Sequence, residues 1–172
     1  MKPKEMLKKT TKYLDNLNKA KALCVVVGLP KGTNENQRYT KRIYSEVKGR
    51  FKSNSSMKEP TVLEVGAMYE YGHGAVQRSF LQMPLDTMKD VLVYEIDKQF
   101  KNAINENFDS KKSLERIGIT AYKIVLRAFD TKGFGKWADI SAKWKKEKGS
   151  EIVLVHTALL KSSIAWMVRN AS

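Results

Sequence analysis

The chain has 172 residues, 42% of them hydrophobic, which is enough for one domain, 1–172, with its own hydrophobic core. It holds 32 lysines and arginines against 18 aspartates and glutamates, a formal net charge of +14. No run of about 18 apolar residues occurs and the first residues lack an apolar core, so neither a membrane span nor a signal peptide is expected. The single cysteine, Cys24, lies in an apolar run, and we expect a reduced, buried side chain made in a cytosol.

The basic residues are concentrated at the front of the chain. Residues 1–60 hold 15 lysines and arginines against five acidic residues, a balance of +10, and the remaining 112 residues have a balance of only +4. Such a surface indicates either contact with nucleic acid or an acidic protein, or a solvated face that keeps the protein soluble. No aromatic side chains are interleaved with the charges as a stacking platform, which counts against nucleic acid.

Residues 3–20 predict an amphipathic helix, with lysines opposite a stripe of Met6, Leu7, Thr10, Tyr13, Leu14 and Leu17. A basic amphipathic helix can bind membranes or acidic partners, but we expect this stripe to pack on a sheet. Residues 22–28 predict a strand, because the segment is short, rich in valine and stopped by Gly28 and Pro30. Its uninterrupted apolar run predicts burial on both faces.

Residues 31–60 predict a polar, basic insertion loop, within which residues 39–51 form either a strand or a brief helix. A loop of this length is usually functional, or flexible until a partner arrives. Its basic side chains are the candidates for that contact: Lys31, Arg38, Lys41, Arg42, Lys48, Arg50 and Lys52.

A short helix follows, with a clear start and a clear end. Thr61 and Glu64 have the spacing of a capping box, and Gly72-His-Gly74 breaks the helix. Its inward face is predicted to be Val62, Val65, Ala67, Met68 and Tyr71. After the break come Arg78, Phe80 and Leu81, and Pro84 is expected to open the next helix.

Two long helices are predicted next. The first, residues 84–107, has an apolar stripe of Met88, Leu92, Ile96, Phe100, Ala103 and Ile104. The second, residues 111–129, is capped by Asp109 or Ser113 and has an apolar face of Leu114, Ile117, Ala121, Ile124, Val125 and Ala128. Gly118 inside it costs about 1 kcal/mol relative to alanine, so we expect another helix to cross closely there.

The rest of the chain predicts a loop at 130–135, a short lysine-rich helix at 140–148, a possible strand at 151–155 and a closing strand at 162–169. We expect the closing strand to pair with residues 22–28. Trp137 and Trp166 belong to the core or to an interface, since tryptophan is favoured at both. The fold class is therefore α+β: a small, mainly antiparallel sheet with one or two further strands, packed against two long helices, with an N-terminal amphipathic helix.

No catalytic signature is present. The only histidines, His73 and His156, and the one cysteine are too few for a zinc site of usual spacing. There is no Gly-x-Ser-x-Gly elbow and no phosphate-binding loop, and Gly72-x-Gly74 lacks the third glycine of a dinucleotide loop. We therefore expect no enzyme, no cofactor and no metal.

Two blocks of sequence carry a resemblance to a known family. Glu70-Tyr71-Gly72 followed by Arg78-Ser79-Phe80-Leu81 resembles the central motif of tail-completion or head–tail joining proteins of long-tailed phages, in which Glu-aromatic-Gly leads into Pro-x-Arg-x-Phe. Residues 154–164 are similar to that family's ending, matching it at Thr157, Leu160, Ser163 and Ile164. The chain departs from the pattern twice, with Val76 for a proline and Ala158 for a glycine. The two blocks have the family's order and span most of the chain.

The resemblance implies a structural virion protein of the phage neck. It would be made in the host cytoplasm, form a homohexameric ring and complete the head-proximal end of the tail. Its partners would be the tail tube or tail terminator protein and the head-closure or connector proteins, with DNA passing through the channel and no membrane. The implied interface candidates are Glu70, Gly72, Arg78, Phe80, Thr157, Leu160 and Ser163.

Several alternatives remain open at the level of sequence. Arg78 either bonds the end of the preceding helix or Glu70 within the chain, or crosses a subunit boundary to a neighbour. In the family, residues 151–155 would be a connector before a turn of helix at 157–161, and the loop 31–60 would reach a neighbour or the lumen. The main functional alternative is a stand-alone basic protein that binds nucleic acid.

Overall fold

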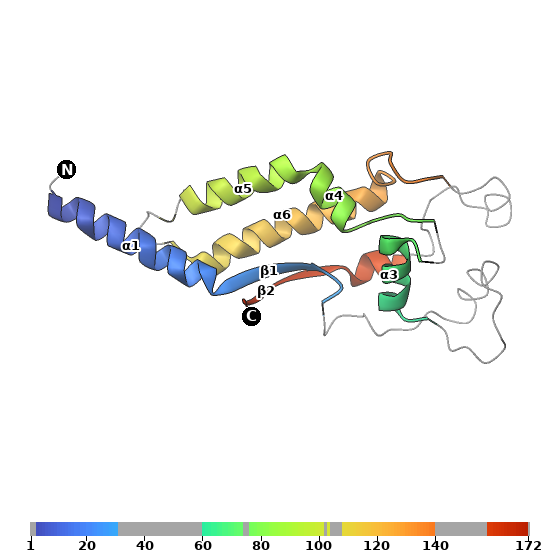
Figure 1. Cartoon of the computed structure of the whole chain (residues 1–172), viewed down its shortest axis with the longest axis horizontal. Helices are drawn as coiled ribbons and strands as arrows, with labels where there is room; N and C mark the ends of the chain where they lie inside the picture. The colour runs from blue at the N-terminus through green and yellow to red at the C-terminus, as the bar shows by residue number, and fades with distance from the viewer. Residues whose placement is uncertain are drawn as a thin grey trace.

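The computed structural model describes residues 3–30, 60–73, 76–101, 103, 108–139 and 158–171. It is a mixed structure of helices and an antiparallel sheet, the α+β class expected. The elements are α1 (Pro3–Lys21), β1 (Leu23–Gly28), α3 (Val62–Tyr71), α4 (Gln82–Thr87), α5 (Lys89–Lys101), α6 (Ser110–Asp130), α8 (Ala158–Ser163) and β2 (Ala165–Asn170). Figure 1 shows an elongated molecule with α6 along its middle, α5 on one side of it and the two strands on the other. α1 lies at one end of the long axis, and α3 and α8 lie at the other.

The sheet is an antiparallel pair of β1 and β2, so the predicted pairing is confirmed. Val25 lies opposite Val168 and Val27 opposite Trp166. Residues 39–51, predicted as a strand or a brief helix, and the possible strand at 151–155 lie outside the described residues. Five of the six residues of β1 are only half-buried, so the expected burial on both faces is wrong. The reason is that α6 covers one face of the sheet, and no described helix covers the other (Figure 1).

The helix α6 begins at the predicted cap, since the Asp109 carboxylate accepts a hydrogen bond from the backbone N–H of Lys112 at 3.1 Å. All six residues predicted for its apolar face are buried. Gly118 does mark a close approach, but the expectation of a crossing helix is wrong. A Cβ at this position would lie 2.7 Å from the Trp166 ring and 3.1 Å from Val25, so the sheet crosses α6 there.

This contact gives a first testable prediction. Gly118→Ala is expected to lower the free energy of unfolding by about 1–2 kcal/mol, because overpacking against an indole ring and a strand outweighs the gain in helix propensity. Gly66→Ala in α3 is the matched control. Its Cβ would meet the tip of Leu29 at 2.9 Å, a flexible, half-buried side chain. That variant should stay within about 1 kcal/mol of the unaltered protein. Urea unfolding of both variants checks this, and a Gly118→Ala protein at least as stable as Gly66→Ala would contradict it.

The first of the two long helices expected, 84–107, is broken. α4 ends at Thr87, the backbone at Met88 has φ −107° and ψ 27°, and α5 begins at Lys89. The Thr87 hydroxyl donates a hydrogen bond to the carbonyl of Met83 at 2.7 Å, a back-bond that commonly bends helices. The apolar spacing on both sides of Met88 hid this bend.

The inward face of α5 also differs from the predicted stripe. Ile96 is 41% exposed and Gln99 is 2% exposed instead. The Gln99 amide donates to Glu95 at 2.5 Å and accepts from Arg116 of α6 at 3.5 Å. α5 therefore packs on α6 partly through a satisfied polar group, which no apolar pattern can predict. Ile104 lies outside the described residues.

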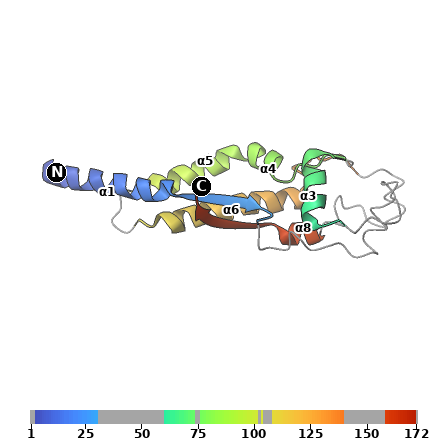
Figure 2. The same cartoon turned by 60° about the horizontal axis from the view of Figure 1, so that its bottom comes forward.

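A helix occupies Pro3–Lys21, but the expectation that its apolar stripe packs on the sheet is wrong for four of the six residues, among them the exposed Thr10. Met6, Leu7 and Leu14 are 57%, 71% and 53% exposed. The second half of α1 is held by buried Ala20 and by Asn16, whose amide donates to the carbonyl of Ala103 at 2.8 Å. The first half extends beyond the rest of the molecule in both views (Figures 1 and 2).

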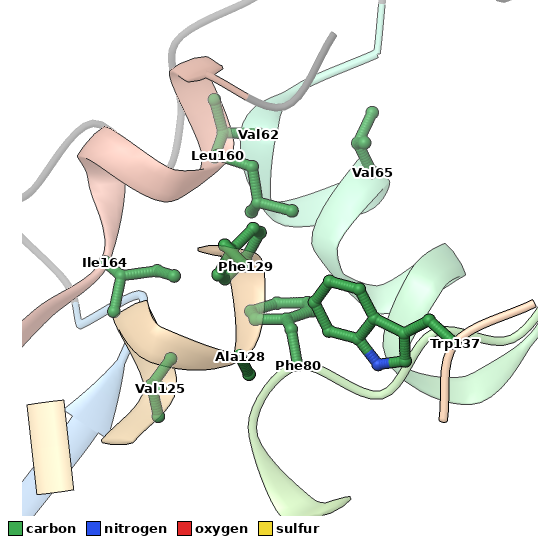
Figure 3. Close-up of a cluster of buried hydrophobic side chains, with 9 residues drawn as sticks. All are labelled: Val62, Val65, Phe80, Val125, Ala128, Phe129, Trp137, Leu160 and Ile164. Carbon is green, nitrogen blue, oxygen red and sulfur yellow. The ribbon is translucent and has the colours of Figure 1, made fainter. Parts of the chain in front are cut away.

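The hydrophobic core lies at the opposite end, where α3, α8 and the last turns of α6 meet (Figure 3). α8 runs to Ser163, so the closing strand starts at Ala165, three residues later than predicted. An ion pair between Lys161 of α8 and Asp130 of α6 joins the two helix ends. The buried cluster consists of Val62, Val65, Phe80, Val125, Ala128, Phe129, Trp137, Leu160 and Ile164.

Candidate functional site

The helix α3 begins and ends where the sequence predicts. The Thr61 hydroxyl accepts from the Glu64 N–H at 3.2 Å, and the Glu64 carboxylate accepts from the Thr61 N–H at 2.6 Å. Gly72 ends the helix in the left-handed conformation, with φ 75°. The predicted inward face is partly wrong, because Ala67 and Tyr71 are exposed. Gly66 and Glu70 are buried in their place.

Glu70 is the centre of the candidate site. Its side chain is nearly buried, and its two oxygens accept four hydrogen bonds of 2.8–3.0 Å. The donors are the Ser79 hydroxyl and the backbone N–H groups of Phe80, Leu81 and Gln82. These N–H groups stand at the start of α4 and have no partner within that helix, and a negative charge is favoured at such an end. Glu70 of α3 therefore caps α4 from outside it.

The segment between the two helices returns onto the end of α3. The N–H of Arg78 donates to the carbonyl of Tyr69 at 2.8 Å, and the Gln77 amide donates to the carbonyl of Glu70 at 3.0 Å. A Cβ at Gly72 would lie 3.1 Å from the Cβ of Gln77, a tight contact, and the positive φ of 75° itself favours glycine there. The motif Glu-aromatic-Gly is thus a turn that fixes α3 against α4.

The Arg78 side chain ties this turn to a third segment. Its Nε and Nη2 donate to the carbonyl of Ala138 at 3.2 and 3.0 Å. The carbonyl belongs to the segment that follows α6 rather than to the last turn of α3. The residue is 4% exposed, so its side chain has almost no surface to offer a neighbouring subunit.

That third segment reverses direction through an unusual turn. Lys132, Gly133, Phe134 and Gly135 all have positive φ, between 52° and 78°. The turn delivers Trp137 into the core, where it packs edge-on against Phe129 at 5.5 Å between ring centroids. The indole N–H donates to the carbonyl of Ser79 at 3.0 Å.

The residues of the two family-like blocks come together only in part. Phe80 and Leu160 are both fully buried in the core cluster. The hydroxyl of Ser163 is buried and donates to the carbonyl of Leu159 at 2.6 Å, a contact within α8. Thr157 and the seven basic residues of the 31–60 loop lie outside the described residues.

Sequence reasoning missed the contributions of Ser79, Trp137 and Ala138. Ser79 donates to Glu70 and also accepts from the Met83 N–H at 2.9 Å. Trp137 and Ala138 bind residues about 60 positions earlier in the chain. A spacing pattern reports neighbours within a helix or strand, so no local signal marks these contacts.

A shallow hollow of about 390 Å³ adjoins the turn. Lys136 lines this hollow, and its ammonium group donates a hydrogen bond to the Thr87 hydroxyl at 3.0 Å. Among the lining side chains are one carboxylate, Asp86, and one ammonium group, Lys136, with no imidazole or thiol. The lining residues are Gln77, Ser79, Gln82, Met83, Asp86, Thr87 and Lys136. Within the described ranges, no three potential metal ligands gather and no helix is long and apolar enough to cross a membrane.

Comparisons with models of known protein families, with curated proteins and with solved structures found no match for this chain.

Proposed function

We propose that the chain is a structural protein of the phage neck, a ring subunit that completes the head-proximal end of the tail and joins it to the head. The observation that carries the proposal is the convergence of the two family-like blocks. Phe80 from the first and Leu160 from the second are fully buried in one cluster. Both side chains lie beside Gly66, since a Cβ added to this glycine would lie 3.5 Å from Phe80 and 3.3 Å from Leu160.

The proposed mechanism is binding and geometry rather than catalysis. Glu70, Arg78 and Trp137 link three segments through buried hydrogen bonds, which makes the core end of the molecule a rigid platform. The described surfaces that project from this platform would then meet the proteins of the tail and the head. The basic loop 31–60 would face a neighbour or DNA in the channel.

Electron cryo-microscopy of particles of the phage that encodes this chain, or of its purified tails, tests the proposal. We expect six copies in a ring at the head-proximal end of the tail. A complete virion that lacks the protein would overturn the assignment.

The strong positive charge supports a second candidate, a stand-alone nucleic-acid-binding protein. α1 alone carries six lysines against two carboxylates, within a chain of net charge +14. Phosphate binding weakens steeply with salt, with a slope set by the number of phosphates neutralised. DNA binding measured over a salt series therefore separates the two candidates. A neck subunit should bind DNA weakly at every salt concentration. For a DNA-binding protein, the logarithm of the binding constant should fall steeply and linearly with the logarithm of the salt concentration.

A further inference from the structure

The projecting half of α1 carries apolar side chains along one side of the helix. Residues 4–11 are all exposed, and Met6, Leu7 and Leu14 are 57%, 71% and 53% exposed. At 3.6 residues per turn, these three residues and Thr10 between them fall within about one third of the helix circumference. Exposed apolar side chains gathered on one side of a helix mark a contact surface. We call this surface, made of Met6, Leu7, Thr10 and Leu14, the α1 stripe.

The one polar residue of the α1 stripe is ready for burial. The Thr10 hydroxyl donates back to the carbonyl of Met6 at 3.0 Å, and beside the stripe the Thr11 hydroxyl donates to the carbonyl of Leu7 at 3.0 Å. A hydroxyl that keeps a hydrogen bond can leave water at little cost, whereas an unpaired one cannot. The stripe can therefore enter an apolar environment without leaving a hydroxyl unpaired.

Lysines surround the α1 stripe. On the helix, Lys4 and Lys9 border the stripe on its two sides, and Lys8 and Lys12 lie on the opposite side. α1 holds six lysines, no arginine and two carboxylates, a balance of +4. The partner that fits this helix therefore has an apolar interior beneath an anionic surface.

A second copy of the chain does not meet this requirement. Its net charge is +14, and α5, which exposes Val93 and Tyr94, holds three lysines against three carboxylates. Nucleic acid supplies negative phosphates but no apolar interior, so Leu7 and Leu14 would stay in water. Protein interfaces are enriched in arginine and depleted in lysine, whereas α1 has lysines alone.

An anionic phospholipid bilayer supplies both parts. Its phosphates form the negative surface, and its acyl chains begin directly beneath them. The long stem of a lysine can lie along apolar surface while the ammonium group stays beside the phosphates. Clusters of about four to eight basic residues on an amphipathic helix are a pattern by which proteins bind such lipids, and α1 has six lysines.

We propose that α1 binds the surface of an anionic phospholipid bilayer, with the α1 stripe at the boundary between headgroups and acyl chains. The helix lies in the plane of the surface and does not cross it, since no described helix is long and apolar enough to span a membrane. The inference goes beyond the proposed function and does not rest on it. A ring subunit of the neck needs no membrane, so the contact belongs to the free chain before assembly.

The test measures binding of the purified chain to vesicles by flotation. One set of vesicles is phosphatidylcholine alone, and the other contains about 30% phosphatidylglycerol. The chain should bind the anionic vesicles at least about tenfold more tightly than the neutral ones, because each lysine near the surface contributes about fivefold.

Two variants separate the apolar and the basic contributions. Leu7→Gln/Leu14→Gln removes apolar area at unchanged charge and should weaken binding to the anionic vesicles at least about tenfold. Lys4→Gln/Lys8→Gln removes charge and leaves the α1 stripe intact, and it should also weaken this binding about tenfold or more.

Each variant has a matched control elsewhere on the molecule. Val93→Gln/Tyr94→Gln removes exposed apolar side chains of α5, and Lys111→Gln/Lys123→Gln removes two exposed lysines of α6. Both controls should bind the anionic vesicles like the unaltered protein. Circular dichroism confirms that every variant is folded.

Three outcomes would overturn the inference. One is an unaltered chain that fails to bind anionic vesicles at low salt. Another is vesicle binding that the controls weaken as much as the α1 variants do, since the attraction would then not depend on α1. The third is a chain that binds a short DNA duplex but not the vesicles, which would favour the nucleic-acid-binding candidate instead. The neck assignment is decided by microscopy of virions, so failure of one inference leaves the other standing.

Discussion

Replacement of Glu70 by glutamine is expected to lower the free energy of unfolding by about 2–3 kcal/mol. One carboxylate oxygen accepts from the N–H groups of Phe80 and Leu81, and the other from the Ser79 hydroxyl and the Gln82 N–H. A glutamine must place its NH₂ group against one of these pairs. The better choice faces Ser79, whose hydroxyl can turn and accept, and then the Gln82 N–H loses its partner. Glu70→Ala removes all four acceptor contacts and should cost about 3–5 kcal/mol.

The matched control is Glu64→Gln in the same helix. Glu64 belongs to the exposed capping box, in which glutamine serves nearly as well as glutamate. Its effect should be below about 0.5 kcal/mol. Chemical unfolding followed by circular dichroism measures all three variants. If Glu70→Gln and Glu64→Gln are equally stable, the buried carboxylate does not hold the turn.

Gly133→Ala is expected to destabilise the protein by about 3–5 kcal/mol. An added Cβ would lie 2.3 Å from Cδ1 and 2.4 Å from Nε1 of Trp137, closer than atoms can approach. The indole must therefore leave its place against Phe129 and give up its hydrogen bond to Ser79. The positive φ of 66° adds a further cost of about 1–2 kcal/mol.

Two residues further on, Gly135 separates backbone strain from the clash. Its φ is 78°, and a Cβ there would meet nothing within 4 Å. Gly135→Ala should therefore cost only about 1–2 kcal/mol, the cost of the left-handed backbone alone. The unfolding free energies of the two alanine variants, measured side by side, give the comparison. Equal values would show that the position of Trp137 does not depend on the space left by Gly133.

The features that sequence predicted are those whose cause lies within a few residues. The Thr61–Glu64 capping box, the stop at Gly72 and the Asp109 cap are local hydrogen-bond patterns, and each is confirmed. The apolar face of α6 was correct because one helix face meets the core along its whole length. The pairing of the first and last strands was also correct.

The features that sequence missed depend on residues far apart in the chain. Glu70 was named as an interface candidate, but its four contacts to the start of α4 needed the return of the chain from Gly72. Gln99 is buried because Arg116 of another helix satisfies its oxygen. Gly118 signalled a close approach without revealing that its partner was Trp166 of a strand. Glu70, Gly72, Arg78 and Phe80 were named from the sequence as interface candidates, and the contacts that they make within the chain were seen only in the structure.

The pairing of β1 with β2 has a consequence for synthesis of the protein. The Cys24 thiol of β1 donates to the carbonyl of Asn170 in β2, and these two residues are 146 positions apart. At roughly 5–20 residues per second, the ribosome makes β1 roughly 7–30 seconds before β2. Throughout that interval β1 lacks its partner strand, and after α6 has been made its apolar side still lacks Trp166, so the nascent chain exposes surface that invites aggregation. Chaperones would act in this interval, and the described fold is complete only after β2 has left the exit tunnel.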